Sequence, residues 1–217
     1  MPAYIKLCIA TWKFPYVVLD YKNLKDYTDL CVDNRLTRFT LPQIADVVRV
    51  HVLRDHGGYW LDADTILTTD KLPDVTIFGN SISRSNSIGF LNTEPNSDMF
   101  TKWAEYQDNV INQSEIKYHW NLVGNVFTDP YLKEHTEVKI GDIEGRWPEV
   151  RMIREDIPRW NKYQQFYFGS NYHLDDINPA DLIMLHNSWT PDWYKRLPKE
   201  KVLSQQCTLS NILREAT

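Results

Sequence analysis

The spacing of apolar residues predicts one well-defined helix over residues 41–56. Apolar side chains recur there at helical intervals, at Ile44, Val48 and Val52. Thr40 and Gln43 have the spacing of a capping box, which marks a helix start. The glycine pair at residues 57–58 then marks its end, because glycine readily adopts the left-handed conformation that often follows a helix.

Short apolar runs elsewhere alternate with further helical patterns. Residues 3–12 fit either a helix or a strand, residues 144–170 have no regular period, and the tail predicts a short final helix. A further helix is expected at 99–110, and strands are expected at 16–19, 59–61, 75–78, 81–83, 138–140 and 182–185. This alternation predicts an α/β fold, and no linker-like stretch divides residues 1–217, so we expect a single domain.

Composition and charge exclude several classes of protein. The 217-residue chain is 42% hydrophobic and 24% charged, which is typical of a globular domain. Its net charge of −5 argues against nucleic-acid binding through backbone phosphates. No stretch approaches the roughly 20 apolar residues of a membrane-spanning helix, and the N-terminus lacks signal-peptide order. Cys8, Cys31 and Cys207 are widely spaced, which favours a reduced, cytoplasmic chain over a disulfide framework.

Two aspartates separated by one residue follow the strand expected at 59–61. In an extended segment, Asp62 and Asp64 would project to the same side as Trp60. Adjacent carboxylates repel each other unless a cation lies beside them, and Mg²⁺ and Mn²⁺ prefer oxygen ligands. The pair therefore indicates a diphosphate-bearing substrate held through a metal. The alternative is a polar strand end in which Asp64 caps the next turn.

A charged pair on the predicted helix is the second candidate feature. Asp46 and Arg49 are three residues apart on one helix face, among apolar neighbours. Unpaired charge would be costly in such surroundings. The two side chains form either a simple intrahelical ion pair or a pair that binds hydroxyl groups of a ligand near the two aspartates.

The run ADVVRVHVLRDHGGYWLDADT, residues 45–65, resembles the core of the DXD-type sugar transferases. It is similar to the capsular polysaccharide synthesis glycosyltransferases and to relatives with a sugar-binding region containing DXD. The initial MPAYIKLCIATWK and the late LIMLHNSWT also resemble segments of that family. The likeness extends from about residue 2 to residue 190 and is weakest in the middle.

The resemblance implies a GT-A fold, a Rossmann-like mixed sheet flanked by helices. It also implies retaining, metal-dependent transfer of a hexose from a UDP-linked or other nucleotide sugar. The acceptor would be a glycan or lipid-linked glycan in bacterial surface polysaccharide synthesis. We therefore expect a cytoplasmic enzyme, peripheral at the inner membrane face and without stable membrane insertion.

Family roles can be carried over residue by residue. Asp64 would bind Mn²⁺ or Mg²⁺, and Asp62 would contact the nucleotide ribose, the metal or both. Asp46 and Arg49 would hold hydroxyl groups of the donor sugar, and Asn86 would add a donor-sugar contact.

The closing segment, His186, Ser188 and Trp189, would cover the diphosphate. His186 is a candidate further metal ligand, although a lone buried histidine is commonly a core residue. Arg146-Trp147 and Arg159-Trp160 could form an acceptor pocket or serve an ordinary structural purpose.

The resemblance has two departures, and it leaves other functions open. Relatives usually carry a strand before the MPAYIKLC-like segment; here that strand is missing, or residues 4–12 take its place, or the chain is a shortened form. Many relatives also have a T-G-P stretch where this sequence has Val123-Gly124-Asn125. One alternative is a non-catalytic sugar-binding or assembly partner derived from such an enzyme. A protein-glycosylating toxin-like transferase is a second, and a metal-dependent hydrolase built on Asp62 and Asp64 is a third.

Overall fold

A computed structural model describes residues 1–30, 34–79, 86–143, 158–177 and 181–217. The chain divides into two compact units. We call residues 17–61 and 74–143 the sheet unit, and residues 1–16, 62–73 and 144–217 the terminal unit. The single-domain prediction stays untested, and each unit is described by itself.

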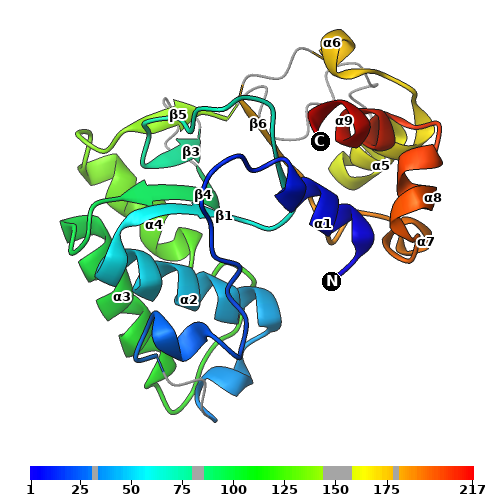
Figure 1. Ribbon diagram of the computed structural model, residues 1–217. Coiled ribbons are helices and arrows are strands. Elements are labelled where there is room, and N and C mark those ends of the chain that lie inside the picture. The colour runs from blue at the N-terminus through cyan, green and yellow to red at the C-terminus, as the bar shows by residue number, and fades with distance from the viewer. Residues whose placement is uncertain (31–33, 80–85, 144–157, 178–180) are drawn as a thin grey trace. The chain divides into compact units, whose positions relative to one another are not determined.

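The sheet unit is built on a four-stranded mixed sheet (Figure 1). Its strand order is β1-β4-β3-β5. β4 runs antiparallel to both β1 and β3, whereas β3 and β5 are parallel. The strands are β1 (Gly58–Leu61), β3 (Ile77–Gly79), β4 (Asn86–Thr93) and β5 (Ile140–Asp142).

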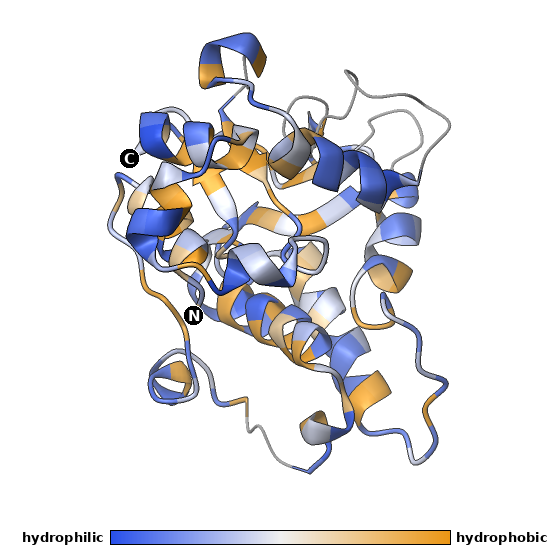
Figure 2. Ribbon diagram, turned by 90° about the vertical axis from the view of Figure 1, so that its right-hand side faces the viewer, coloured by the Kyte–Doolittle hydropathy of each residue, from blue (hydrophilic) through white to orange (hydrophobic). Residues whose placement is uncertain are grey.

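Three helices lie together against this sheet, below it in the view of Figure 1. They bury apolar side chains while carrying hydrophilic residues as well, a mixture visible along the ribbons in Figure 2. Trp103 is fully buried in their core, and its indole N–H donates to the Val123 carbonyl at 3.0 Å. The helices are α2 (Leu41–His56), α3 (Asp98–Ile111) and α4 (Asn125–Glu134), with short 3₁₀ turns η1 (Leu24–Asp26) and η2 (Leu36–Arg38) before them.

The predicted limits of α2 are confirmed. Thr40 and Gln43 form the capping box, and the Thr40 amide donates to Gln43 Oε1 at 3.1 Å. Gly57 ends the helix with a φ of 65°, and a Cβ there would lie 2.6 Å from Pro95 Cδ. Glycine is therefore required at this position by both conformation and space.

The terminal unit packs helices around an antiparallel pair of strands. Thr65 to Leu67 (β2) pairs with Leu182 to Met184 (β6). Side chains from α1 and the C-terminal helices bury a common apolar core with this pair, including Tyr4, Ile66 and Leu209. The helices are α1 (Ala3–Ala10), α5 (Arg159–Gly169), α6 (Leu174–Ile177), α7 (Asp192–Lys195), α8 (Lys199–Ser204) and α9 (Thr208–Ala216).

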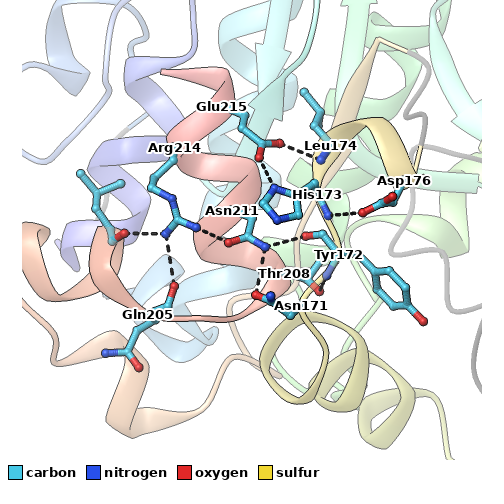
Figure 3. A network of polar contacts seen from close by, with 11 residues as sticks. Asn171, Tyr172, His173, Leu174, Asp176, Gln205, Thr208, Asn211, Arg214 and Glu215 are labelled. Atoms are coloured by element: carbon cyan, nitrogen blue, oxygen red, sulfur yellow. Dashed lines mark hydrogen bonds and ion pairs between the residues drawn. The ribbon is translucent and has the colours of Figure 1, made fainter.

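A polar network fastens α9 to the segment that precedes α6 (Figure 3). Asn211 donates to the Tyr172 carbonyl at 2.9 Å. Glu215 pairs with His173 at 2.5 Å and accepts from the Leu174 amide at 2.7 Å. The last helix is therefore held by polar contacts from Asn211 and Glu215 as well as by its buried apolar side chains.

The α/β class is confirmed, with a mixed sheet flanked by helices. The helical alternative holds for residues 3–10, and both the helix at 98–111 and the helical tail are confirmed. The expected strands at 75–78 and 138–140 are present with shifted limits, as β3 and β5. The strand expected at 81–83 lies outside the described residues.

The predictions for residues 16–19 and 159–169 are wrong. Residues 16–19 form no strand: Tyr16 and Val17 are about half exposed, and the Val18 carbonyl accepts from the Asn23 side chain at 2.9 Å instead of joining a ladder. Residues 159–169 are helical rather than irregular, because Tyr163, Phe166 and Tyr167 recur at helical spacing and are buried together.

A membrane-spanning segment is also absent from the described helices. None of them combines the length and the apolar character that crossing a bilayer requires.

Candidate functional site

The Asp-Ala-Asp sequence forms a turn in the terminal unit. The Thr65 amide donates to the Asp62 carbonyl at 2.9 Å, which closes the turn directly before β2. The prediction of an extended segment here is therefore wrong, and the two-residue alternation of a strand does not set the directions of these carboxylates. Asp62 and Asp64 are both partly buried.

Pairing of β2 with β6 brings Asp64 to the His-Asn-Ser-Trp segment. Thr65 lies opposite Met184 in this pair, and the Leu185 amide donates to the Asp64 carbonyl at 3.2 Å. Two residues beyond Leu185, the Asn187 amide donates to Asp64 Oδ2 at 2.8 Å. A hydrogen bond from a backbone amide to a carboxylate is charge-assisted and favours the ionised form. Two segments about 120 residues apart, both singled out in the sequence, thus meet within one unit.

Tyr4 of α1 bonds to the side chain of Asn187, the residue whose backbone amide bonds to Asp64. Its hydroxyl donates to Asn187 Oδ1 at 2.5 Å, and the side chain is fully buried. Burial raises the pKa of Tyr4, so the phenol remains protonated and keeps its donor. The sequence predicts no role for Tyr4 or Asn187, although both lie in the segments that carry the family resemblance.

His186 occupies the turn after β6 as a neutral imidazole. Burial lowers the pKa of His186 to about 4. Its ring lies on Trp189, with centroids 3.9 Å apart, and its backbone amide donates to the hydroxyl of buried Tyr163 at 3.4 Å. Ser188 is exposed beside it. A neutral imidazole is the form that binds metals, but these contacts also suit a packed core histidine, so the ligand role stays a prediction.

In the sheet unit, the structure brings Asp46 and Arg49 together as the sequence predicts. Arg49 Nη2 lies 2.9 Å from Asp46 Oδ1, and their side chains are 5% and 13% exposed respectively. The guanidinium also donates to the Ile88 carbonyl of β4 and lies over the Trp60 ring at 5.3 Å. Arg49 therefore contacts protein groups from α2, β1 and β4.

Asn86, the predicted donor-sugar contact, is bonded to α4. Its amide donates to Asp129 Oδ1 at 2.7 Å, while Thr128 Oγ1 and Asn125 Nδ2 donate to its own side-chain oxygen at 3.0 and 3.2 Å. Burial raises the pKa of Asp129, although Asn125 and Lys133 partly oppose that shift. These bonds tie the start of β4 to α4, so Asn86 has a structural role in addition to any contact with a ligand.

The chain approaches the Asp46 carboxylate closely at the turn before α4. A Cβ on Gly124 would lie 2.8 Å from Ile88 Cδ1 and 3.8 Å from Asp46 Oδ2. Buried Gln107 donates to the Asp46 carbonyl at 3.1 Å and to the Val123 carbonyl at 2.7 Å. Gln107 and Gly124 thus shape the surroundings of Asp46, and no spacing signal in the sequence identifies either role.

The other candidate residues are less informative. Arg159 and Trp160 open α5, where both are exposed, and Arg146 and Trp147 lie outside the described residues. Within the described ranges, no group of three or more His, Cys, Asp and Glu side chains is arranged to hold a metal ion. A cation at Asp64 would therefore depend on a few carboxylate oxygens together with oxygens from its substrate.

Comparison with known proteins gives one match. Residues 1–133 of the 217-residue chain match the family model described as "capsular polysaccharide synthesis protein", which covers more than half of the sequence. No curated protein and no solved structure matches the chain. The matched range includes Tyr4, the Asp46–Arg49 pair and the Asp62–Asp64 turn. The chain belongs to the capsular polysaccharide synthesis protein family.

Proposed function

We propose that this protein is a metal-dependent retaining glycosyltransferase. It would transfer a hexose from a nucleotide sugar, in the first instance a UDP-sugar, to a glycan or lipid-linked glycan in the synthesis of a bacterial surface polysaccharide. Membership of the capsular polysaccharide synthesis protein family supports a role in surface polysaccharide synthesis. The observation that carries the proposal is the 2.8 Å bond from the Asn187 amide to Asp64, which places the Asp-Ala-Asp turn beside the His-Asn-Ser-Trp segment.

The carboxylates of the Asp-Ala-Asp turn are of the type that Mn²⁺ and Mg²⁺ prefer as ligands. Mg²⁺ is commonly held by one or two carboxylates together with substrate phosphates, so a full protein cage is not needed. Asp64 is the proposed ligand, Asp62 of the same turn a second oxygen donor, and neutral His186 a further candidate. When bound, the cation would stabilise negative charge on the departing diphosphate.

The chain's own groups would position Asp64 and cover the diphosphate. The Asn187 amide fixes one oxygen of Asp64, and Tyr4 fixes the Asn187 side chain, so Asp64 is pre-oriented. Exposed Ser188 offers a hydroxyl donor, and Trp189 offers an indole face beside His186. No protein nucleophile is assigned, and the departing phosphate would accept the proton of the acceptor hydroxyl.

Asp46 is the proposed contact to hydroxyl groups of the donor sugar, with Arg49 as its positioning residue. Arg49 is nearly buried and already engages Asp46, the Ile88 carbonyl and the Trp60 ring. Its main effect on the sugar would therefore pass through Asp46. This assignment modifies the equal roles that the sequence suggests for the two residues.

The test is a thermal-shift panel of nucleotide sugars with and without Mn²⁺. We expect at least one UDP-sugar to raise the melting temperature only when Mn²⁺ is present, because the diphosphate would complete the cation's ligand shell. Asp64→Ala should abolish this metal-dependent shift. Asp70→Ala, which removes an exposed aspartate from the same stretch of chain, is the matched control and should retain it.

Turnover separates an enzyme from its non-catalytic alternative. With the stabilising donor and Mn²⁺, a transferase should slowly release nucleoside diphosphate and free hexose even without acceptor. Donor binding without any release would favour the sugar-binding partner. A full metal-dependent shift in Asp64→Ala would remove the metal role of Asp64 and with it the proposed mechanism.

A further inference from the structure

The sheet unit contains a cavity of about 280 Å³ away from Asp46 and Arg49. Its walls come from residues 28–30 and 35–36 and from the facing ends of α2 and α3. His51, which lines it, is five residues beyond Asp46 on α2, which turns its side chain about 140° around the helix axis. The cavity therefore belongs to a different face of α2 from the proposed donor contact.

His51 lines this cavity, and its side chain carries a buried polar atom. The residue is 4% exposed, and its Nε2 makes no hydrogen bond. The atom lies 3.5 Å from Asp108 Oδ1, which also lines the cavity. Asp108 is therefore the charged group nearest to this atom, and a ligand bound to the Asp108 carboxylate would change the surroundings of the His51 imidazole.

The described residues of the wall carry charged groups of both signs. Arg54 is engaged by Asp55 through two bonds, at 2.7 and 3.1 Å. Arg35 donates to Asn112 Oδ1 at 2.8 Å. The carboxylates of Asp29 and Asp108 complete the polar wall. Guanidinium donors and carboxylate acceptors therefore face the same small space.

We propose that this cavity binds one neutral sugar ring of a glycan, at a site separate from the donor site. A sugar hydroxyl both donates and accepts, so one ligand can donate to the carboxylates and accept from a guanidinium. Leu36 and Ile111 supply apolar wall for the C–H face of the ring. Small-molecule pockets typically measure about 300–1,000 Å³, and a cavity of about 280 Å³, just below that range, suits a single ring.

Charged ligands fit the wall less well. An inorganic anion near Arg35 would meet the carboxylates of Asp29 and Asp108, and a cation near those carboxylates would meet Arg35 and Arg54. A neutral polyol avoids both conflicts. The inference rests on this wall alone and does not require that the protein transfers a sugar.

The experiment follows the imidazole resonances of the full chain by ¹H–¹³C NMR. D-glucose, D-galactose, D-mannose and N-acetyl-D-glucosamine are titrated one at a time, and inorganic phosphate is titrated separately. We expect a saturable shift of the His51 signal with at least one sugar and none with phosphate. Asp108→Ala, at a half-exposed position, should weaken the binding of that sugar by about tenfold, because a hydrogen bond to a charged group is lost.

The matched control is Asp74→Ala, an exposed acid of the same unit that pairs with Lys139. It should leave sugar binding unchanged, as should Asp64→Ala, whose defect would be confined to nucleotide-sugar binding. Nucleotide-sugar binding should in turn survive in Asp108→Ala. No His51 shift with any of the four sugars, a shift with phosphate alone, or full sugar affinity in Asp108→Ala would each overturn the proposal.

Discussion

The two units hold their candidate carboxylates through different kinds of contact. In the sheet unit, Asp46 is paired three residues along its own helix with Arg49, which is itself nearly buried. In the terminal unit, Asp64 accepts from the backbone amide of Asn187, from a strand end far along the chain. The first arrangement uses an opposite charge and local spacing, and the second uses a backbone dipole and strand pairing. The Asp46–Arg49 contact therefore depends on helical spacing, whereas the contact of Asp64 with Asn187 depends on the register of two strands.

The largest expected effect comes from breaking the buried pair. Arg49→Ala would leave the carboxylate of Asp46 and the Ile88 carbonyl without this donor. Removing one partner of a buried pair typically costs about 3–5 kcal/mol, so we expect a loss of that order in the free energy of unfolding. Denaturant unfolding, followed by tryptophan fluorescence, measures it.

The control for this change is Arg54→Ala, on the same helix. Arg54 pairs with Asp55, but both side chains are about 30% exposed, at 29% and 33%. Partly exposed pairs contribute about 0–1 kcal/mol, so the loss should be small. Equal losses in the two variants would mean that burial does not distinguish the pairs, and the contrast between the units would fail.

The next effect concerns the buried histidine of the terminal unit. The pKa of His186 is lowered by burial to about 4, against an ordinary value of 6.5. The unfolded chain therefore takes up this proton first as the pH falls, so stability is full above pH 6.5 and declines towards pH 4. The shift of 2.5 units corresponds to about 3 kcal/mol. Unfolding free energies of His186→Gln between pH 7 and pH 4 should show a correspondingly weaker decline.

His51 gives the matched comparison in the sheet unit. Burial also lowers its pKa, but Asp108 favours the charged form and partly opposes burial. His51→Gln should therefore reduce the acid-dependent loss of stability less than His186→Gln does. The reverse order would show that the terminal unit's histidine is not held neutral by burial.

The same contrast explains what the sequence could and could not predict. α2 was predictable to its limits, because its cap, its apolar period and its terminal glycine are all local signals. The Asp46–Arg49 contact followed from helical spacing for the same reason. The geometry at Asp64 could not be predicted from helical spacing, because the Asp-Ala-Asp turn and its bond to Asn187 depend on the register of β2 with β6. The strand predicted for YVVL, residues 16–19, is absent for a similar reason. The composition favours a strand, but a strand also needs a neighbouring strand with which to pair.

Tyr4 tests whether the terminal unit's contact serves binding as well as stability. Tyr4→Phe removes the hydroxyl that donates to Asn187 Oδ1 at 2.5 Å. We expect a loss of about 1 kcal/mol in unfolding free energy and a similar, roughly fivefold, weakening of metal-dependent donor binding. Calorimetric unfolding and titration with the donor measure the two effects.

Tyr106→Phe provides the control from the sheet unit. Tyr106 donates to the Leu122 carbonyl at 2.9 Å, so its removal should cost a similar amount of stability. Donor binding should be unaffected in that variant. If Tyr4→Phe also left donor binding unchanged, Tyr4 would be a purely structural residue, and the terminal unit would lose its distinguishing feature.

The smallest expected effect comes from an exposed ion pair, Glu215 with His173 (Figure 3), which is the counterpart to buried Arg49. Burial opposes ionisation of Glu215, but the bonds from His173 and the Leu174 amide outweigh it and lower its pKa below the ordinary 4.5. A lowered carboxyl pKa contributes stability that is present above pH 4.5 and is lost as the pH falls through the folded value. The side chain of His173 is 53% exposed and that of Glu215 is 34% exposed. Glu215→Gln should therefore lower the free energy of unfolding by less than about 1 kcal/mol at pH 7. The difference from the unmodified chain should shrink as the pH falls below 4.5, and measuring unfolding at pH 7 and at pH 3 checks this. A loss as large as that of Arg49→Ala would show that α9 depends on its polar contacts and not mainly on its buried apolar face.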